Sequence, residues 1–240
     1  MAIKMRFELP QLSAFSGTNA AADMPIEMCI YGPQSNRTEI NKLRFRAFRS
    51  AGWIHDSGTE EFSDHYDDLA SAFSIGAFRS GTCLGTLRLA FGGRGYEGLT
   101  MPCQEQFPLQ LAKLSNDRPC LVEFSRLAVE PSLTNQSARS ILLASLVRAG
   151  VILATGASTD IAFIAVHRRV SQFYQSVCGF KIIAQSDRYA EIQEPTHLLG
   201  LTLREIALQR RRTRDLLKMS RYEVEAARQA MEALVTRKAA

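Results

Sequence analysis

The chain has 240 residues, of which 46% are hydrophobic and 22% are charged, the composition of an ordinary soluble globular protein. No run of about 18 apolar residues indicates a membrane span, and the first residues hold no apolar stretch of secretory length, so a cytoplasmic location is expected. The five cysteines and four histidines lack the spacing of a disulfide framework or a zinc site, and no metal is expected.

The charge of the chain is unevenly distributed. The net charge of +5 lies entirely in residues 201–240, which hold ten Lys and Arg against five Asp and Glu. Residues 198–238 also have amphipathic helical spacing, which predicts a basic helical extension over 198–240. Residues 1–24 show little pattern, and a loose N-terminal arm is predicted there.

Between these ends, strand and helix patterns alternate. The first half predicts a strand at 26–32, a helix at 36–48, an acidic loop at 50–71, a β-hairpin at 72–91 that turns at Arg79–Gly81, a glycine-rich loop at 92–102 and a short helix at 103–114. The second half predicts strands at 120–130, 160–166 and 180–185, with helices at 137–156 and 168–179. This order predicts an α/β fold, with a mixed central sheet flanked by helices, over residues 25–197.

At this point the chain resembles a known superfamily. The run from "FSRLAVEP" through "SARSILLASL" and "IAFIAV" to "RRVSQFYQSVCGF" resembles the second half of a GNAT acyltransferase. The motifs "LRFRAFRSAGW", "FSDHYDD", "GTLRL" and "EFSR" follow the order found in acyl-homoserine lactone autoinducer synthases. They fit at least as well the related long-chain N-acyl amino acid synthases. The resemblance covers roughly residues 38–185.

The resemblance implies an N-acyltransferase that moves a fatty acyl chain from a thioester to the α-amine of an amino acid by direct aminolysis. Glu123 would be the general base, and Tyr174 would protonate the leaving thiolate. The four motifs assign substrate binding to Arg44, Phe48, Asp64, Asp67, Arg88, Ser125 and Arg126. The thioester and its phosphopantetheine arm would lie along Leu127, Val129, Ser137 and Arg139, where a helix N-terminus favours a phosphate.

Glu123 and Arg126 stand in the middle of an apolar strand, where an unpaired charge is costly to bury. In a regular strand these two side chains point to opposite faces of the sheet. A bulge residue between them would turn both to one face and free a backbone N–H, which could polarise a thioester carbonyl. A structural ion pair inside the sheet is the alternative interpretation.

The acid cluster around Asp64 and Asp67 offers counter-charges to the arginines of the other motifs. Arg44, Arg88 and Arg126 each stand beside apolar residues and need such partners if they are buried. We therefore expect the acidic loop to be ordered by these three arginines and to fold over the acceptor amine. The alternative is a solvated turn.

Two positions depart from the family patterns. Autoinducer synthases usually carry a glutamate two residues before the first aspartate of the acidic loop, and Phe62 stands there in this chain. This departure weakens the case for S-adenosylmethionine as a substrate. The helix entry "NQSARS" lacks the glycines with which coenzyme A-binding GNATs cradle a pyrophosphate, and a carrier-protein arm has only one phosphate.

The expected co-substrate is therefore an acyl-carrier-protein phosphopantetheine thioester or acyl-coenzyme A, with no tightly bound cofactor and a small amino acid as acceptor. An acyl carrier protein is the expected partner, docking on Arg210, Arg211, Arg212 and Arg214. Nucleic acid is not expected, and peripheral membrane contact through the C-terminal helix stays open. The alternatives are an autoinducer synthase and a catalytically silent GNAT-like binding or regulatory protein.

Overall fold

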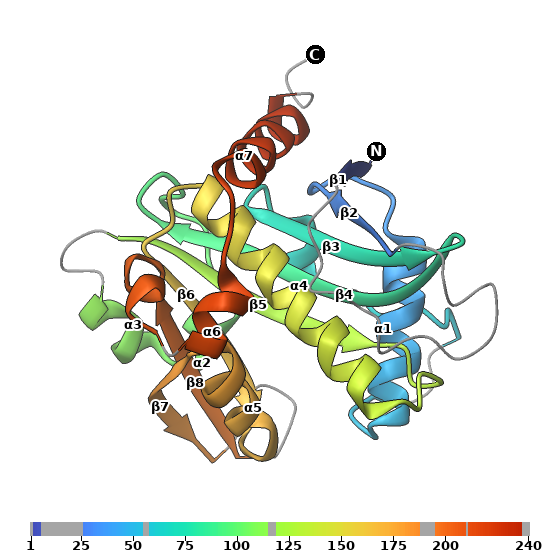
Figure 1. The fold of residues 1–240 in the computed structure, drawn as a ribbon. Coiled ribbons are helices and arrows are strands. Elements are labelled where there is room, and N and C mark those ends of the chain that lie inside the picture. Colours follow the sequence, from blue (N-terminus) through green and yellow to red (C-terminus); the bar gives the residue numbers. More distant parts are fainter. Residues whose placement is uncertain are drawn as a thin grey trace.

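The computed structural model describes residues 2–5, 26–54, 58–114, 119–187, 195–209 and 211–236. These residues form an eight-stranded sheet in the order β1-β2-β3-β4-β5-β6-β8-β7 (Figure 1). The strands are Ala2–Met5 (β1), Glu27–Tyr31 (β2), Ala72–Arg79 (β3), Thr82–Gly93 (β4), Cys120–Val129 (β5), Ile161–His167 (β6), Lys181–Ser186 (β7) and Thr196–Thr202 (β8). β5 and β6 pair in parallel and the other neighbours antiparallel, so the predicted mixed sheet is confirmed.

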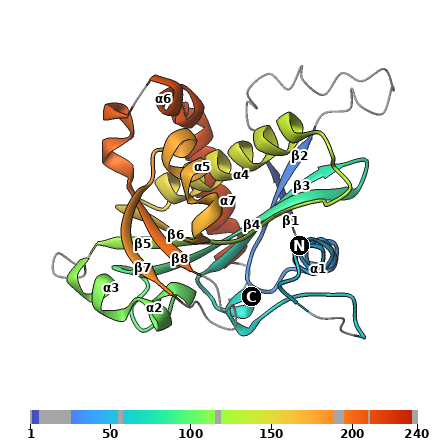
Figure 2. The ribbon, with the colours of Figure 1, turned by 90° about the horizontal axis from the view of Figure 1, so that it is seen from below.

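Helices cover both faces of the sheet (Figure 2). On one face lie α1 (Thr38–Ser50), α2 (Pro102–Gln106) and α3 (Pro108–Leu114); on the other lie α4 (Gln136–Gly156), α5 (Arg168–Cys178), α6 (Arg211–Leu217) and α7 (Arg221–Thr236). Two short 3-10 turns, His65–Asp68 (η3) and Leu203–Leu208 (η5), complete the described elements. The predicted hairpin is confirmed, with Ser80 and Gly81 at positive φ in its turn.

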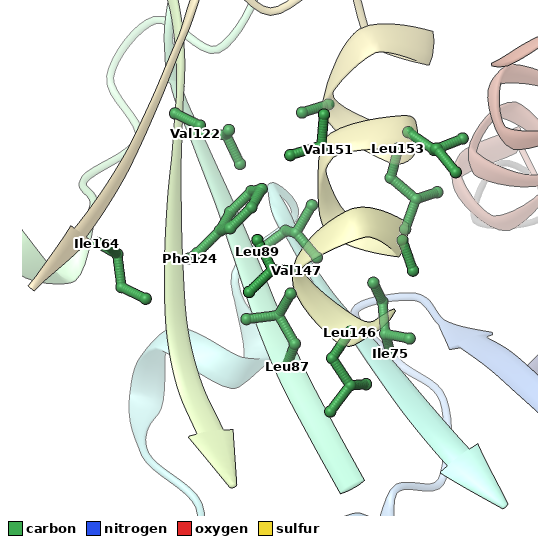
Figure 3. Close-up of a cluster of buried hydrophobic side chains, with 14 of the residues drawn as sticks. Ile75, Leu87, Leu89, Val122, Phe124, Leu146, Val147, Val151, Leu153 and Ile164 are labelled. Atoms are coloured by element: carbon green, nitrogen blue, oxygen red, sulfur yellow. The ribbon is translucent and has the colours of Figure 1, made fainter. Parts of the chain in front are cut away.

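The main core lies between α4 and the sheet. Figure 3 shows Val147 of α4 packing towards Leu87 of β4 and Phe124 of β5, all of them buried. α4 is long and apolar enough to cross a membrane, but 72% of its apolar window is buried inside the protein, as in a core helix. Because strand side chains alternate, the neighbouring residues Arg88 and Glu123 point to the opposite face, towards α1 and α2.

The N-terminal arm is not loose where the structure describes it. Residues 2–5 form β1, which pairs antiparallel with β2 so that Met5 stands opposite Met28. Met5 is also buried in the main core. The prediction of a loose arm is therefore wrong for these four residues, and residues 6–25 lie outside the described residues.

The prediction placed the start of the C-terminal helical extension, at residue 198, too early in the chain. Residues 198–202 belong to β8, which lies between β6 and β7 and completes the sheet. The helical part of the extension follows β8 as η5, α6 and α7. The body of the fold therefore runs to Thr202 rather than to residue 197.

The extension docks on the body through α7. The guanidinium of Arg148 on α4 donates to the Glu223 carboxylate at 2.8 Å and to the Lys218 carbonyl at 2.8 and 3.1 Å. The backbones of α4 and α7 come close at Gly156, where a Cβ would lie 3.1 Å from the Val224 carbonyl oxygen. Ala227, Ala230 and Met231 of α7 are buried in the main core, whereas Leu208 and Tyr222 of the extension are exposed.

Breaking the Arg148–Glu223 pair should detach α7 and destabilise the fold. Arg148→Ala leaves a buried carboxylate without its partner, and we expect a loss of about 3 kcal/mol in unfolding free energy. Arg228→Ala removes an arginine that pairs with Glu225 and Glu232 on the surface of α7, and should change the melting temperature little. Equal shifts in the two melting temperatures would contradict a docked α7.

Candidate active site

The acidic loop between α1 and β3 is shaped by its own aspartates. Asp64 caps η3, and one of its carboxylate oxygens accepts from the Tyr66 N–H at 3.0 Å. In return, Asp67 Oδ2 accepts from the Asp64 N–H at 3.1 Å. This reciprocal capping box explains why the two aspartates are three residues apart.

Three arginines from separate elements converge on the two aspartates, as predicted. Arg44 of α1 donates to Asp67 Oδ1 at 2.8 Å, and Arg88 of β4 lies 3.4 Å from the same oxygen and also binds Asp64. Arg126 of β5 donates to Asp64 Oδ2 through Nε at 3.0 Å and through Nη2. This ion network ties α1, β4 and β5 to the acidic loop.

Most of the ion network is buried, so each of its charges needs a partner of opposite charge. The side chains of Arg44, Arg88 and Asp67 are at most 1% exposed. Burial alone would raise the pKa of Asp64 and Asp67, but the neighbouring guanidinium charges outweigh it and hold both pKa values below their usual range. Burial lowers the pKa of Arg44 to about 10, which leaves it charged at neutral pH. Removing the Asp67 charge would leave the buried Arg44 without its charged partner.

Arg126 is the most accessible arginine of the ion network, with 30% of its side chain exposed. Its guanidinium carbon lies 4.8 Å from the ring centre of Phe62 and 6.0 Å from that of Phe48. The two rings contact each other edge to face at 5.3 Å. Phe62, at the position where autoinducer synthases usually carry a glutamate, therefore presents an apolar ring to Arg126.

β5 carries a bulge, which lies at Arg126 and Leu127 rather than between Glu123 and Arg126 as predicted. The pairing of β4 with β5 shifts by one residue between Thr86 and Arg88, and Arg126 adopts a left-handed φ of 53°. This conformation turns Arg126 to the face that already carries Glu123 and Ser125. Arg88 Nε donates to Ser125 Oγ at 3.0 Å on that face. The three polar residues of "EFSR" are thus brought together.

Glu123 is completely buried, and its two carboxylate oxygens differ. Oε2 accepts from the backbone N–H of Cys103 on α2 at 2.6 Å, whereas Oε1 is buried without a hydrogen-bond partner among the described residues. Burial raises the pKa of Glu123, although the hydrogen bonds from Cys103 and the charge of Arg88 oppose this shift. In this carboxylate a donor fixes one oxygen, and the other has no hydrogen-bond partner among the described residues. Such a buried carboxylate is well suited to accept a proton.

Cys103 belongs to the site, but the sequence did not predict this. Its contact with Glu123 is a hydrogen bond from the backbone N–H, which does not depend on the type of side chain. Its thiol also lies against the Glu123 carboxylate. Burial, followed by the charge of Glu123, raises the pKa of Cys103 well above its usual value. A buried thiol with a raised pKa is a poor nucleophile.

β5 and β6 diverge beside the bulge. Their pairing ends at Phe124 and Ile164, although both strands continue beyond these residues. Leu127 and Val129 lie in the diverging part of β5, where Val129 is buried and Leu127 is half-buried against the main core. Both residues predicted to lie along the thioester are therefore on the diverging segment.

The residues predicted to bind phosphate lie at the start of α4. Ser137 is exposed in the first turn, and Asn135 caps the helix by accepting from a first-turn N–H at 3.0 Å. The Arg139 guanidinium donates to the carbonyl oxygens of Glu130 and Leu133 at 3.2 and 3.3 Å. Arg139 thus orders the loop from β5 into α4, and its phosphate role stays a prediction.

Tyr174 is not brought to Glu123. It lies in the main core on the α4 face of the sheet, with its ring 6.4 Å from that of Phe180. Burial raises its pKa, so the phenol stays protonated as a proton donor must, and its catalytic role stays a prediction. His167 caps α5 by accepting from the Arg169 N–H at 3.1 Å, the structural role that a histidine at a strand end usually has.

The predicted docking arginines are only partly described. Arg210 lies outside the described residues, Arg211 and Arg212 form the first turn of α6, and Arg214 is exposed on the same helix. α6 packs beside the C-terminal end of α5, where Thr213 approaches Gly179. The structure leaves their role in docking untested.

The chain matches the model of the family described as N-acyl amino acid synthase FeeM over residues 39–202. The chain belongs to this family. The matched segment contains the acidic loop, the ion network, the bulge and Glu123. The protein is thus an N-acyltransferase of the N-acyl amino acid synthase family, as the motifs predicted. A comparison with curated proteins gave no match.

Solved structures share the fold at low sequence identity. The structure of FeeM, an N-acyl amino acid synthase from uncultured soil microbes, is 19% identical with a TM-score of 0.64, over 80% of this chain and 98% of that one. The AHL synthase LasI is also 19% identical, with a TM-score of 0.59, over 77% of this chain and 95% of that one. The coenzyme A-dependent acyl-homoserine lactone synthase BjaI is 16% identical, with a TM-score of 0.55, over 83% and 97%. These likenesses confirm the GNAT-like fold.

The ion network should govern the acid stability of this family member. Asp64→Asn should cost about 2 kcal/mol at pH 7, because two arginines lose a charged partner. A carboxyl whose pKa is lowered by folding stabilises above its unfolded pKa of about 4 and ceases to do so as the pH falls further. The difference between variant and wild type in chemical unfolding should therefore shrink between pH 5 and pH 3.

The matched control is Asp68→Asn in the same loop, because Asp68 pairs with Arg37 but its side chain is 80% exposed. This variant should stay close to wild type at every pH. A stability loss in Asp64→Asn that does not change between pH 6 and pH 3 would show that the carboxylate charge is unimportant.

Proposed function

We propose that this enzyme transfers a fatty acyl chain from the thioester of an acyl carrier protein, or of coenzyme A, to the α-amine of an amino acid. The membership of the N-acyl amino acid synthase family supports the amide product. The observation that carries the mechanism is the Glu123 carboxylate, with Oε2 held by the Cys103 N–H and Oε1 open.

In the proposed reaction, the acceptor amine attacks the thioester carbonyl carbon while Glu123 Oε1 takes a proton from the nitrogen. A C–N bond forms, and negative charge develops on the carbonyl oxygen. Backbone N–H groups of β5 beyond Phe124, where pairing with β6 has ended, would stabilise this oxyanion. The C–S bond then breaks, and the thiolate leaves and takes up a proton. Tyr174 is the proposed donor of that proton.

Arg126 is the proposed partner of the acceptor carboxylate. Of the three arginines in the ion network, only Arg126 has a substantial exposed part, because the side chains of Arg44 and Arg88 are at most 1% exposed. Its guanidinium has donors beyond those used by Asp64, and a carboxylate is the group that such a fork binds best. Arg44 and Arg88 would then act by holding the acidic loop in place.

Glu123→Gln tests the proposed base. The amide is nearly isosteric and can still accept from Cys103, but it is a far weaker base, so kcat should fall about 100-fold. Wild-type kcat should also decline on the acid side with an apparent pKa above the usual glutamate value, because burial raises the pKa of Glu123. The variant should lack this acid limb.

Stability measurements separate this effect from misfolding. A carboxyl whose pKa is raised by folding is disfavoured as a charge in the folded state, so a neutral glutamine should not lower the melting temperature at pH 7. Glu130→Gln, at the end of the same strand and paired with Arg46, is the matched control and should keep wild-type kinetics. Unchanged turnover in Glu123→Gln would remove Glu123 from the mechanism.

The alternative product, a homoserine lactone made from S-adenosylmethionine, is less well supported. A sulfonium substrate carries a positive charge that a carboxylate near the acidic loop would favour. Phe62 replaces the usual glutamate at that point and covers Arg126 with an apolar ring. A neutral or apolar acceptor side chain fits this arrangement better than a cation does.

For the donor, we propose an acyl carrier protein. The start of α4 has no glycine-rich cradle for a pyrophosphate, and the net positive charge of the chain is concentrated in residues 201–240. Acyl carrier proteins are acidic, so such charge would speed their encounter. The α6 arginines are the proposed docking surface, because they carry part of this positive charge on a helix that packs beside the C-terminal end of α5.

Charge reversal tests this docking surface. Arg211→Glu with Arg212→Glu should raise the KM for an acyl-carrier substrate and flatten its salt dependence, while acyl-coenzyme A turnover stays near wild type. The same double reversal at the exposed Arg168 and Arg169 of α5 is the matched control. A KM increase confined to the α5 pair would move the docking surface to α5, and no change in either pair would exclude electrostatic docking at both.

A further inference from the structure

A side-chain hydrogen bond joins the acidic loop to the helix that holds Glu123. Tyr66 lies between the two aspartates of the loop, and its phenol donates to the Glu105 carboxylate on α2. Tyr66 is buried, and the guanidinium carbon of Arg88 lies 5.7 Å from its ring centre. The tyrosine is thus held by the ion network at one end and reaches α2 at the other.

α2 depends on its neighbours for its position. It has five residues, far fewer than an isolated helix needs for stability. Gln106 Nε2 donates to Ser186 Oγ on β7 at 2.9 Å, and Glu105 accepts from the acidic loop. Two residues before Glu105, the Cys103 N–H holds Glu123 Oε2 at 2.6 Å. The contacts that fix α2 therefore also fix the donor to the proposed base.

We propose that Tyr66 and Glu105 are positioning residues for the general base. Their hydrogen bond holds α2 where the Cys103 N–H orients the Glu123 carboxylate and leaves Oε1 open. The proposal rests on the proposed role of Glu123. It also couples the two halves of the site, because the base is oriented only when the ion network has closed around Tyr66.

Displacing the Cys103 N–H would change Glu123 in two ways. The carboxylate would lose its fixed orientation towards the amine, which slows the reaction of bound substrates. It would also lose a donor that favours its charged form, so its pKa would rise further. The remaining charged and titratable groups that face it are the Cys103 thiol on α2, Arg88 on β4, Arg126 on its own strand and Tyr66 on the acidic loop.

The experiment compares three single variants and one double variant by kcat, KM and the pH dependence of kcat. Tyr66→Phe keeps the ring beside Arg88 but removes the donor, and Glu105→Ala removes the acceptor. Each should lower kcat about tenfold, leave the KM for the acyl donor unchanged and move the acid limb to higher pH. Glu105→Gln retains an acceptor oxygen and should stay near wild type. The double variant Tyr66→Phe, Glu105→Ala should be no slower than either single variant.

Two further variants decide the interpretation. Tyr96→Phe removes the hydroxyl from a half-buried tyrosine that stacks on Phe91 at 5.2 Å, and should leave the kinetics unchanged. In the Glu123→Gln background, Tyr66→Phe should cause no further loss. A full additional loss there, or an unmoved acid limb, would overturn the positioning role.

The two proposals fail in distinguishable ways. If Glu123→Gln keeps wild-type turnover, the assignment of the base is wrong whatever Tyr66→Phe does. If Glu123→Gln loses about 100-fold while Tyr66→Phe and Glu105→Ala behave as wild type, the base stands and only the positioning role is overturned.

Discussion

The pairing of the buried Asp67 and the half-buried Asp64 with three arginines is the interaction on which the site depends. Asp67 gives one oxygen to the backbone of its own loop and the other to Arg44 and Arg88. Asp64 binds Arg88 with one oxygen and Arg126 with the other. Because buried charges must be matched, this network fixes the mutual positions of α1, β4, β5 and the acidic loop.

The bulge in β5 makes this network compatible with the strand that carries the proposed base. With strict alternation, Arg126 would point to the same face as Phe124, into the main core. The described residues of that core cluster are hydrophobic and offer no counter-charge. Its left-handed backbone conformation places it instead on the face of Glu123, and the pairing with β6 ends just before it. The bulge therefore brings Arg126 to the face of the sheet on which Glu123 is buried against α2.

The sequence predicted the parts that are encoded in side-chain type and spacing. Arginines in apolar segments need counter-charges when they are buried, and the acidic loop offered aspartates as partners. The spacing of Glu123 and Arg126 in an apolar strand required a bulge to bring both to one face. The prediction from sequence failed where a contact is made by a backbone group, or by residues far apart in the chain. β8 is buried between two strands, so "LLGL" is a continuous apolar run without strand periodicity, and β1 is a four-residue strand. Cys103 meets Glu123 through an N–H that every residue except proline shares, and Glu105 gives no sign of its partner.

The most direct test of the account is the identity of the product. The purified protein should be incubated with a long-chain acyl carrier protein thioester, the standard amino acids and S-adenosylmethionine, and the lipid extract analysed by mass spectrometry. We expect an N-acyl amino acid whose mass is that of the fatty acid plus one amino acid less one water, with one free carrier thiol released per amide. An acyl-homoserine lactone as the main product, or thiol release without any condensed lipid, would contradict it.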